Sequence, residues 1–187
     1  MTVVRSARPN SKKSLPLSRV YRLLEPGPVV LLTTEHRGRA NVMTLSWHTM
    51  LEFEPPLVGC VVSNRNFSFE ALRGGRECVI NIPTATFADA VVKCGNVSGR
   101  RKDKFAAFGL TPLPATQVAA PLIAECYANL ECRVVDAALV NKYNFFVLEV
   151  VKAWIDPKVR APRTLHHRGR GEFMVAGRSL RLPSRAK

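Results

Sequence analysis

Five candidate ligand-contacting side chains lie close together in an otherwise apolar, strand-like stretch: Asn41, Met43, Thr44, Ser46 and Trp47. Hydroxyl and amide groups lose free energy when they are buried without hydrogen-bond partners. The edge of a polar heteroaromatic ring, with alternating carbonyl and N–H groups, would supply such partners. A solvated strand face, with Trp47 as an anchor in the core, explains the same pattern. The stretch by itself therefore leaves both interpretations open.

A second run, from Ser63 to Ser68, has the composition of a phosphate site. It lies between an apolar strand and a short helix, and a helix start presents unpaired N–H groups and the positive end of the helix dipole. Ser63, Asn66 and Ser68 add short hydrogen-bond donors, and the Arg65 guanidinium offers a fork that fits phosphate oxygens. An ordinary helix cap beside an exposed arginine explains the run equally well.

A third segment, residues 94–105, is a polar loop that contains glycine and ends in a basic run. Ser98, Arg100 and Lys104 would meet an anionic ligand if the loop lay against one. Most loops of this composition are simply solvated, and composition favours that interpretation here.

Other sequence signatures of enzymes are missing. There is no P-loop, no G-x-S-x-G, and no G-x-G-x-x-G after a predicted strand. The four histidines show no metal-ligand spacing, so no metal site is predicted. No catalytic side chain is predicted either. An enzyme of this composition would take its chemistry from a cofactor.

The elements that must position these segments are predicted to be mainly strands. Apolar and β-branched stretches predict strands over residues 29–33, 40–47, 57–63, 78–82 and 144–155. A polar turn over residues 35–39 joins the first two strands into a hairpin. Residues 125–135 alternate apolar side chains with Asn129, Glu131 and Arg133, which is the period of a half-buried strand.

Few helices are predicted, over residues 17–24, 67–73 and 86–94. The second follows Asn66, a favourable N-cap residue, and is expected to end before Gly74. Many short strands with a few peripheral helices predict a mainly β fold, an antiparallel barrel rather than a parallel α/β sheet.

The net charge of +14 is concentrated at the two ends. Residues 1–22 hold six Lys or Arg and no acid, and residues 158–187 hold nine against Glu172 alone. Residues 23–157 contain thirteen bases and thirteen acids, so the body offers no charged platform for a nucleic-acid backbone. Such ends are usually solvated arms that aid solubility or meet an acidic partner, and nucleic-acid binding is the less favoured alternative.

Length and hydropathy predict one domain located in the cytoplasm. A chain of 187 residues suits one continuous core. The longest uncharged apolar run, residues 26–34, is too short to span a membrane. The first twenty residues lack the apolar centre of a secretory signal, although their serines and lack of acids faintly resemble a transit peptide.

The five cysteines are predicted to be structural. An odd number without a C-x-x-C pair argues against a disulfide framework and against a zinc site. Cys60, Cys78, Cys126 and Cys132 lie in apolar, strand-like stretches, where free cysteine behaves as a small core residue. Cys94 precedes a glycine at the end of the predicted helix over residues 86–94, so a position on a loop is the alternative for this residue.

In their order and spacing, the three segments resemble the flavin reductase-like, FMN-binding split-barrel family, and within it the flavoredoxin branch. Residues 28–47 resemble its opening hairpin, 63–68 its phosphate-side turn, 94–105 its flavin-covering loop, and 165–173 its late His/Gly-rich stretch. The resemblance implies a Greek-key-like split β-barrel over residues 15–175, flanked by a flexible basic arm (1–14) and a basic tail (176–187).

The resemblance also implies roles for individual residues. The isoalloxazine and ribityl region of FMN would be lined by Asn41, Met43, Thr44, Ser46 and Trp47. The phosphate would be held by Ser63, Arg65, Asn66 and Ser68. From the later part of the chain, Lys104 would approach the flavin with Ser98 and Arg100 nearby, and Phe173 would be an aromatic near the ring. Relatives often carry Gly-Asp-His before the last long strand, where this chain has Asn141, Lys142 and Tyr143, so Tyr143 is expected to pack on the flavin or donate to it.

The function implied is that of an oxidoreductase that takes hydride from NAD(P)H onto FMN and passes electrons to an unidentified acceptor, such as a free flavin or a redox partner. Relatives are homodimers, so a homodimer is implied. One alternative is a flavoredoxin-type electron-transfer module that a partner protein reduces. The other is a non-enzymatic binding module whose basic ends contact nucleic acid.

Overall fold

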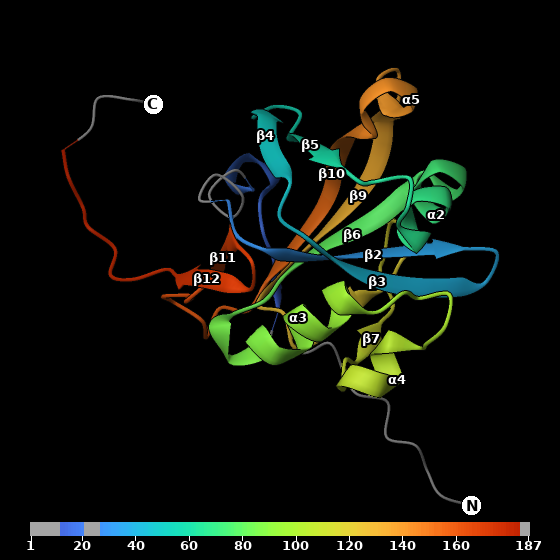
Figure 1. The fold of residues 1–187 in the computed structure, drawn as a ribbon. Helices are drawn as coiled ribbons and strands as arrows, with labels where there is room; N and C mark the ends of the chain where they lie inside the picture. The colour runs from blue at the N-terminus through green and yellow to red at the C-terminus, as the bar shows by residue number, and fades with distance from the viewer. Residues whose placement is uncertain (1–11, 21–26, 184–187) are drawn as a thin grey trace, which may run out of the picture.

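The computed structural model describes residues 12–20 and 27–183, and they form a curved antiparallel sheet with short helices around it (Figure 1). The sheet strands are β1 (Lys13–Ser14), β2 (Val30–His36), β3 (Arg39–Leu45), β4 (His48–Glu52), β5 (Leu57–Val61), β6 (Glu77–Ile82), β9 (Ala128–Asp136) and β10 (Phe145–Ile155). Two separate pairs are β7 (Pro112–Leu113) with β8 (Leu122–Ile123), and β11 (Leu165–Gly169) with β12 (Glu172–Val175).

The strand order is β3-β2-β6-β9-β10-β5-β4, and β1 pairs with β10. Every one of these pairs is antiparallel. Strands β6, β9 and β10 follow one another across the sheet, and β5, which precedes them in the chain, lies against β10. This is a Greek-key arrangement. The predicted mainly β, antiparallel, Greek-key-like fold is therefore confirmed.

The helices are α2 (Phe67–Gly75), α3 (Ala88–Asn96), α4 (Lys104–Phe108) and α5 (Val140–Tyr143), with 3-10 turns η1 (Leu17–Arg19) and η2 (Ala85–Phe87). Of the predicted helix over residues 17–24, the first three residues form the η1 turn, and residues 21–24 lie outside the described part. Helix α2 continues through Gly74 and Gly75 and ends at Arg76. Arg76 adopts the left-handed conformation (φ 56°), and its N–H donates to the Leu72 carbonyl, which caps the helix there. The predicted end before Gly74 was wrong.

Two apolar clusters hold the fold together. One lies inside the curved sheet and includes Cys60, Cys78 and Cys132. The other lies between the outer face of the β2–β3 hairpin and the helices α3 and α4, and it includes Cys94 and Cys126. All five cysteines are buried and unpaired, which confirms their role as core residues. Cys94 lies on the buried face of α3, as the predicted helix over residues 86–94 implies, and not on a loop.

Half-burial was predicted for β9, and exposed and buried residues do alternate from Arg133 to Val135, but the first five residues of the strand, Ala128 to Cys132, are buried on both faces. Asn129 and Glu131 are both fully buried because the segment from residue 111 to 124 covers their side of the strand. The Glu131 carboxylate accepts hydrogen bonds from Thr116, from the Gln117 N–H at 2.6 Å and from Trp154 Nε1 at 2.7 Å. A buried carboxylate is tolerated when donors surround it in this way.

Several predicted strand ends also shift. The predicted strand over residues 40–47 ends at Leu45, the one over 57–63 ends at Val61, and the one over 125–135 begins at Ala128. The remainder of each segment lies in turns and connections.

The chain ends are described only in part. Residues 1–11 of the predicted basic arm lie outside the described residues, and Lys13 and Ser14 pair with β10. Residues 176–183 of the predicted tail form no regular element, and 184–187 lie outside the described range. Within the residues that are described, no helix is long and apolar enough to cross a membrane.

Candidate functional site

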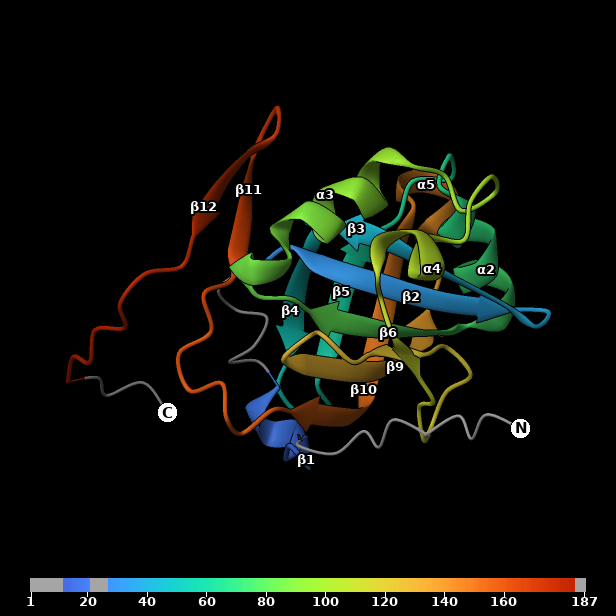
Figure 2. The same ribbon diagram turned by 90° about the horizontal axis from the view of Figure 1, so that it is seen from below.

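A cleft lies where four segments meet: strand β3, the start of α2, the end of α3 with the loop after it, and the β11–β12 hairpin. Figure 2 shows the hairpin standing beside α3, with α2 at the other end of the sheet. The cleft has two neighbouring parts, which share Thr44, Gly95 and Asn96 as lining residues.

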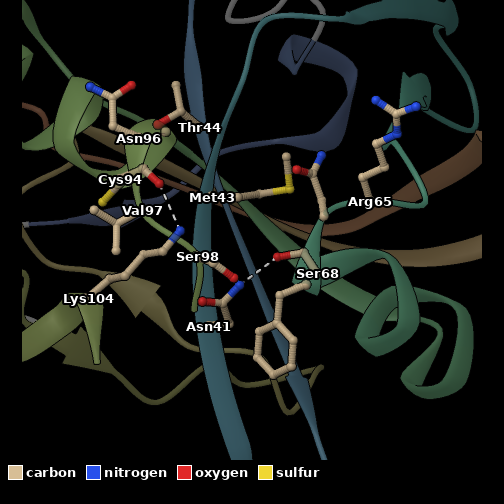
Figure 3. A pocket seen from close by; sticks show the side chains of 13 residues that line it. Asn41, Met43, Thr44, Arg65, Ser68, Cys94, Asn96, Val97, Ser98 and Lys104 are labelled. Atoms are coloured by element: carbon tan, nitrogen blue, oxygen red, sulfur yellow. Dashed lines mark hydrogen bonds between the residues drawn. The ribbon is translucent and has the colours of Figure 1, made fainter. Parts of the chain in front are cut away.

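The first part, here called the polar lobe, has a volume of about 190 Å³. Its lining residues are Asn41, Met43, Thr44, Arg65, Asn66, Phe67, Ser68, Cys94, Gly95, Asn96, Val97, Ser98 and Lys104 (Figure 3). The second part, the apolar lobe, has a volume of about 270 Å³ and is lined by Val29, Thr44, Ser46, Val91, Val92, Gly95, Asn96, His167, Gly171 and Phe173. None of the residues lining either lobe is acidic.

Strand β3 is joined to both helices beside it by hydrogen bonds from its polar side chains. The Asn41 amide donates to Ser68 Oγ at 2.8 Å, in a buried contact with the first turn of α2 (Figure 3). The Thr44 hydroxyl donates to the Val91 carbonyl of α3. The polar groups that the sequence placed in an apolar strand are therefore satisfied mostly by neighbouring helices, and these bonds hold the walls of the cleft together.

Lys104 brings a buried positive charge to the polar lobe. Its side chain is 4% exposed, and Nζ donates to the Cys94 carbonyl at 2.7 Å. Asp103 caps α4 by accepting from the Phe105 and Ala106 N–H groups, and this cap fixes Lys104 at the first position of the helix. Burial lowers the pKa of the Lys104 ammonium, and among the described residues it has no carboxylate partner.

The start of α2 presents backbone donors to the same lobe. Ser63 accepts from the backbone of Arg65 and Asn66, which turns the chain into the helix. The N–H groups of Phe67 and Ser68 have no acceptor within the described part of the chain. Asn66 occupies the N-cap position as predicted, but its side chain makes no capping bond. The polar lobe is thus lined by donors and positive charge, which suits an anion.

The apolar lobe is bordered by the β11–β12 hairpin. His167 and Phe173 face each other across this hairpin, with ring centroids 5.2 Å apart. The hairpin is tied to the sheet by the Val29 N–H, which donates to the Leu165 carbonyl at 2.7 Å. An aromatic wall opposite the apolar face of α3 suits a flat ring system.

The structure brings ten of the fourteen predicted site residues to the cleft: Asn41, Met43, Thr44, Ser46, Arg65, Asn66, Ser68, Ser98, Lys104 and Phe173. Their ligand-binding roles stay predictions.

The other four predicted residues do not line the cleft. Trp47 is 70% exposed, which also contradicts the alternative of a core anchor, because strand β3 ends before it. Ser63 shapes the turn, and the Arg100 guanidinium lies near the Phe67 ring instead. Tyr143 is exposed on α5, close to Lys142, and it is absent from the lining of both lobes.

Sequence reasoning did not assign several lining residues to the site. Asn96 borders both lobes, and His167 lines the apolar lobe. The signal for Asn96 was its place in the polar loop beside Ser98, and the signal for His167 was its place in the late His/Gly-rich stretch. Phe67 gave no such signal, because an aromatic residue at a helix start is usually part of the core.

Comparison with known proteins identifies the fold family. The family model described as the flavin reductase like domain matches residues 21–173, most of the chain. An uncharacterized protein of Escherichia coli K12, YddH, is 33% identical over 178 residues, which covers 88% of this chain and 94% of that protein.

Solved structures agree. The FMN-binding domain of a flavin reductase-like enzyme from Shewanella baltica OS155 superposes with a TM-score of 0.87 at 27% identity, over 92% of this chain and 97% of that one. A flavoredoxin from Methanosarcina acetivorans has a TM-score of 0.72 at 27% identity, over 84% and 89% of the two chains. By its sequence, its antiparallel sheet and its cleft, this chain belongs to the flavin reductase-like domain family.

Proposed function

We propose that the protein binds FMN in the two-lobed cleft and acts as an oxidoreductase with NAD(P)H as electron donor. The observation that carries the proposal is the polar lobe, where the buried Lys104 ammonium, Arg65 and two unpaired N–H groups of α2 meet with no acidic side chain among the lining residues. This donor set fits a phosphate dianion. The family and its FMN-binding structures support the choice of FMN.

Each lobe has a distinct part in this proposal. Lys104, Arg65, Asn66 and Ser98 would hold the phosphate, and the apolar lobe with Phe173 would receive the isoalloxazine ring. Thr44 borders both lobes, where the ribityl chain would pass. When bound, FMN supplies two-electron redox chemistry, accepting hydride from a reduced nicotinamide for transfer to an acceptor. The protein residues bind and orient the reactants, and no acid or base is required of them.

The test is spectroscopic. The purified protein, with FMN added and the excess removed, is expected to retain the visible absorption bands of a flavin. Anaerobic addition of NADH or NADPH should then bleach these bands. Protein that stays colourless at saturating FMN would contradict flavin binding. Bleaching by dithionite but by neither nicotinamide would contradict the NAD(P)H reductase and favour an electron carrier, as the similarity to a flavoredoxin suggests.

We also propose that the protein is a homodimer. Trp47 and Leu51 lie beside and on the edge strand β4 and are 70% and 46% exposed, so this edge of the sheet presents large apolar side chains to the solvent. A second copy of the chain would cover them. Light scattering after size exclusion is expected to give twice the monomer mass, and a monomer would contradict the proposal.

A further inference from the structure

Arg39 joins three segments that line the polar lobe, although it does not line the lobe itself. It is the first residue of β3, and its Nη2 donates to the Gly99 carbonyl at 2.6 Å. Its guanidinium carbon also lies 4.8 Å from the centre of the Phe67 ring. One side chain thus connects the strand of Asn41, the first residue of α2 and the loop that carries Ser98.

Gly99 brings this loop into unusually close contact with the strand. A Cβ at this position would lie 2.0 Å from Asn41 Oδ1 and 3.0 Å from the Phe67 ring. Only glycine leaves room for this approach. The amide nitrogen of the same Asn41 donates to Ser68, so loop, strand and helix start meet at one point.

Arg100, predicted to lie near the flavin beside Lys104, takes part in this junction instead. Its guanidinium carbon lies 5.7 Å from the centre of the same Phe67 ring. Its backbone N–H donates to the Ser98 hydroxyl, which borders the polar lobe. The position of Ser98 therefore depends on a loop that Arg39 holds in place. No ion pair among the described residues involves Arg39 or Arg100.

An arginine is required at position 39 by this geometry. A planar guanidinium can donate to a carbonyl in its own plane while its face lies near an aromatic ring. The compact ammonium of lysine keeps the charge but cannot make both contacts in the same way. Arg39→Lys is therefore a conservative variant that separates geometry from charge.

We infer that Arg39 is a positioning residue that holds the Gly99 loop against the start of α2 and thereby sets the preference of the cleft for a phosphorylated flavin over riboflavin. The inference rests on the proposed binding of FMN. Riboflavin lacks the phosphate and would use the apolar lobe and Thr44, which Arg39 does not contact.

The experiment titrates FMN and riboflavin separately, following the quenching of flavin fluorescence, into the full chain and its variants. Arg39→Lys and Arg39→Gln are expected to weaken FMN binding about tenfold, the effect of losing a charge-assisted hydrogen bond, and to leave riboflavin binding unchanged. Arg101→Gln is the matched control. It removes the same charge from the loop that Arg39 contacts, at a side chain with no hydrogen bond, ion pair or ring contact among the described residues, and should leave the ratio of the two affinities unchanged.

Gly99→Ala provides a second, independent variant. Its added Cβ displaces the loop from Asn41, so it should lower the ratio of FMN to riboflavin affinity in the same direction. Thermal unfolding of each variant without flavin checks that the variant folds. If Arg39→Gln or Gly99→Ala fails to fold, the affinities of Arg39→Lys alone test the inference. A wild-type ratio in Arg39→Lys, or equal weakening of both flavins, would overturn the inference. A wild-type protein that binds neither flavin would overturn the proposed function along with it.

Discussion

The Lys104 ammonium donates to the Cys94 carbonyl at 2.7 Å, and it does so at a position where it is almost completely buried. The two residues come from α4 and α3, and this single neutral acceptor is the only hydrogen-bond partner of the charge among the described residues. A buried cation without an anion costs free energy. The ligand that enters the polar lobe is therefore expected to supply the missing negative charge.

Replacement of this lysine should separate binding from stability. Lys104→Met is expected to weaken FMN binding by about 10- to 100-fold, the range for losing a charge-assisted contact, without lowering the stability of the flavin-free protein. Titration and thermal unfolding of the flavin-free variant measure the two effects. Lys93→Met, at an exposed lysine of α3 paired with Asp89, is the control and should change neither. If Lys104→Met lowered the stability while binding FMN normally, a structural role would be indicated.

The affinity for FMN should also depend on pH through the same group. Burial lowers the pKa of Lys104 below its ordinary value of 10.5. The phosphate is a dianion above about pH 7, because its second pKa is near 6. As pH rises further, Lys104 loses its proton before an exposed lysine would, and the dissociation constant of FMN should increase. Titrations at increasing pH test this, and the increase should be absent in Lys104→Met.

His48 makes stability depend on pH on the acid side. Its Nε2 bonds to the Pro28 carbonyl, and its buried Nδ1 has no hydrogen-bond partner among the described residues. Burial lowers the pKa of the ring from 6.5. The unfolded chain then binds a proton at a higher pH than the folded protein does. The contribution of His48 to the free energy of unfolding is fully present above about pH 6.5, the pKa in the unfolded chain. It decreases as the pH falls from there to the pKa of the folded protein, by at most about 1.4 kcal/mol for each pH unit.

The measurement for His48 is urea unfolding at a series of pH values. The His48→Gln variant keeps a donor for Pro28 but does not titrate, so the difference between variant and wild type isolates this residue. Identical pH profiles for the two proteins would show that His48 does not contribute.

The rate at which Cys94 reacts with a thiol reagent should depend on whether FMN occupies the cleft. Burial raises its pKa to about 11 and that of Cys60 to about 12, so both thiols are protonated and slow to react at pH 8. Cys94 alone of the five borders the cleft. Iodoacetamide is therefore expected to label it first and slowly, and FMN should slow the labelling further. Peptide mass spectrometry identifies the site, and faster labelling of Cys60 or Cys126 would contradict this order.

Local sequence was sufficient for six strands of the main sheet (β2, β3, β5, β6, β9 and β10) and for the turn at residues 63–68, but not for β4 or for the β11–β12 hairpin. Alternating side chains indicate a strand because successive residues of a strand face opposite sides. The polar stretch at residues 41–47 and the start of α2 were recognisable as candidate ligand-binding segments. Hydroxyl, amide and guanidinium groups are rare in apolar surroundings because their burial costs free energy unless they find hydrogen-bond partners. The neutral composition of residues 23–157 likewise placed the basic charge outside the body of the protein.

Only the tertiary structure decided which side chains meet. Glu131 is buried because a segment at residues 111–124 covers it, and Lys104 is buried because α4 packs against α3; neither partner lies next to it in sequence. Tyr143, expected at the flavin, is on α5 and lines neither lobe of the cleft. Arg39, expected only as part of a polar turn, joins three of the segments that line the cleft. Alternation and composition encode which way a side chain faces locally. The partner that it meets depends on strand order and long-range packing, and these are properties of the whole chain.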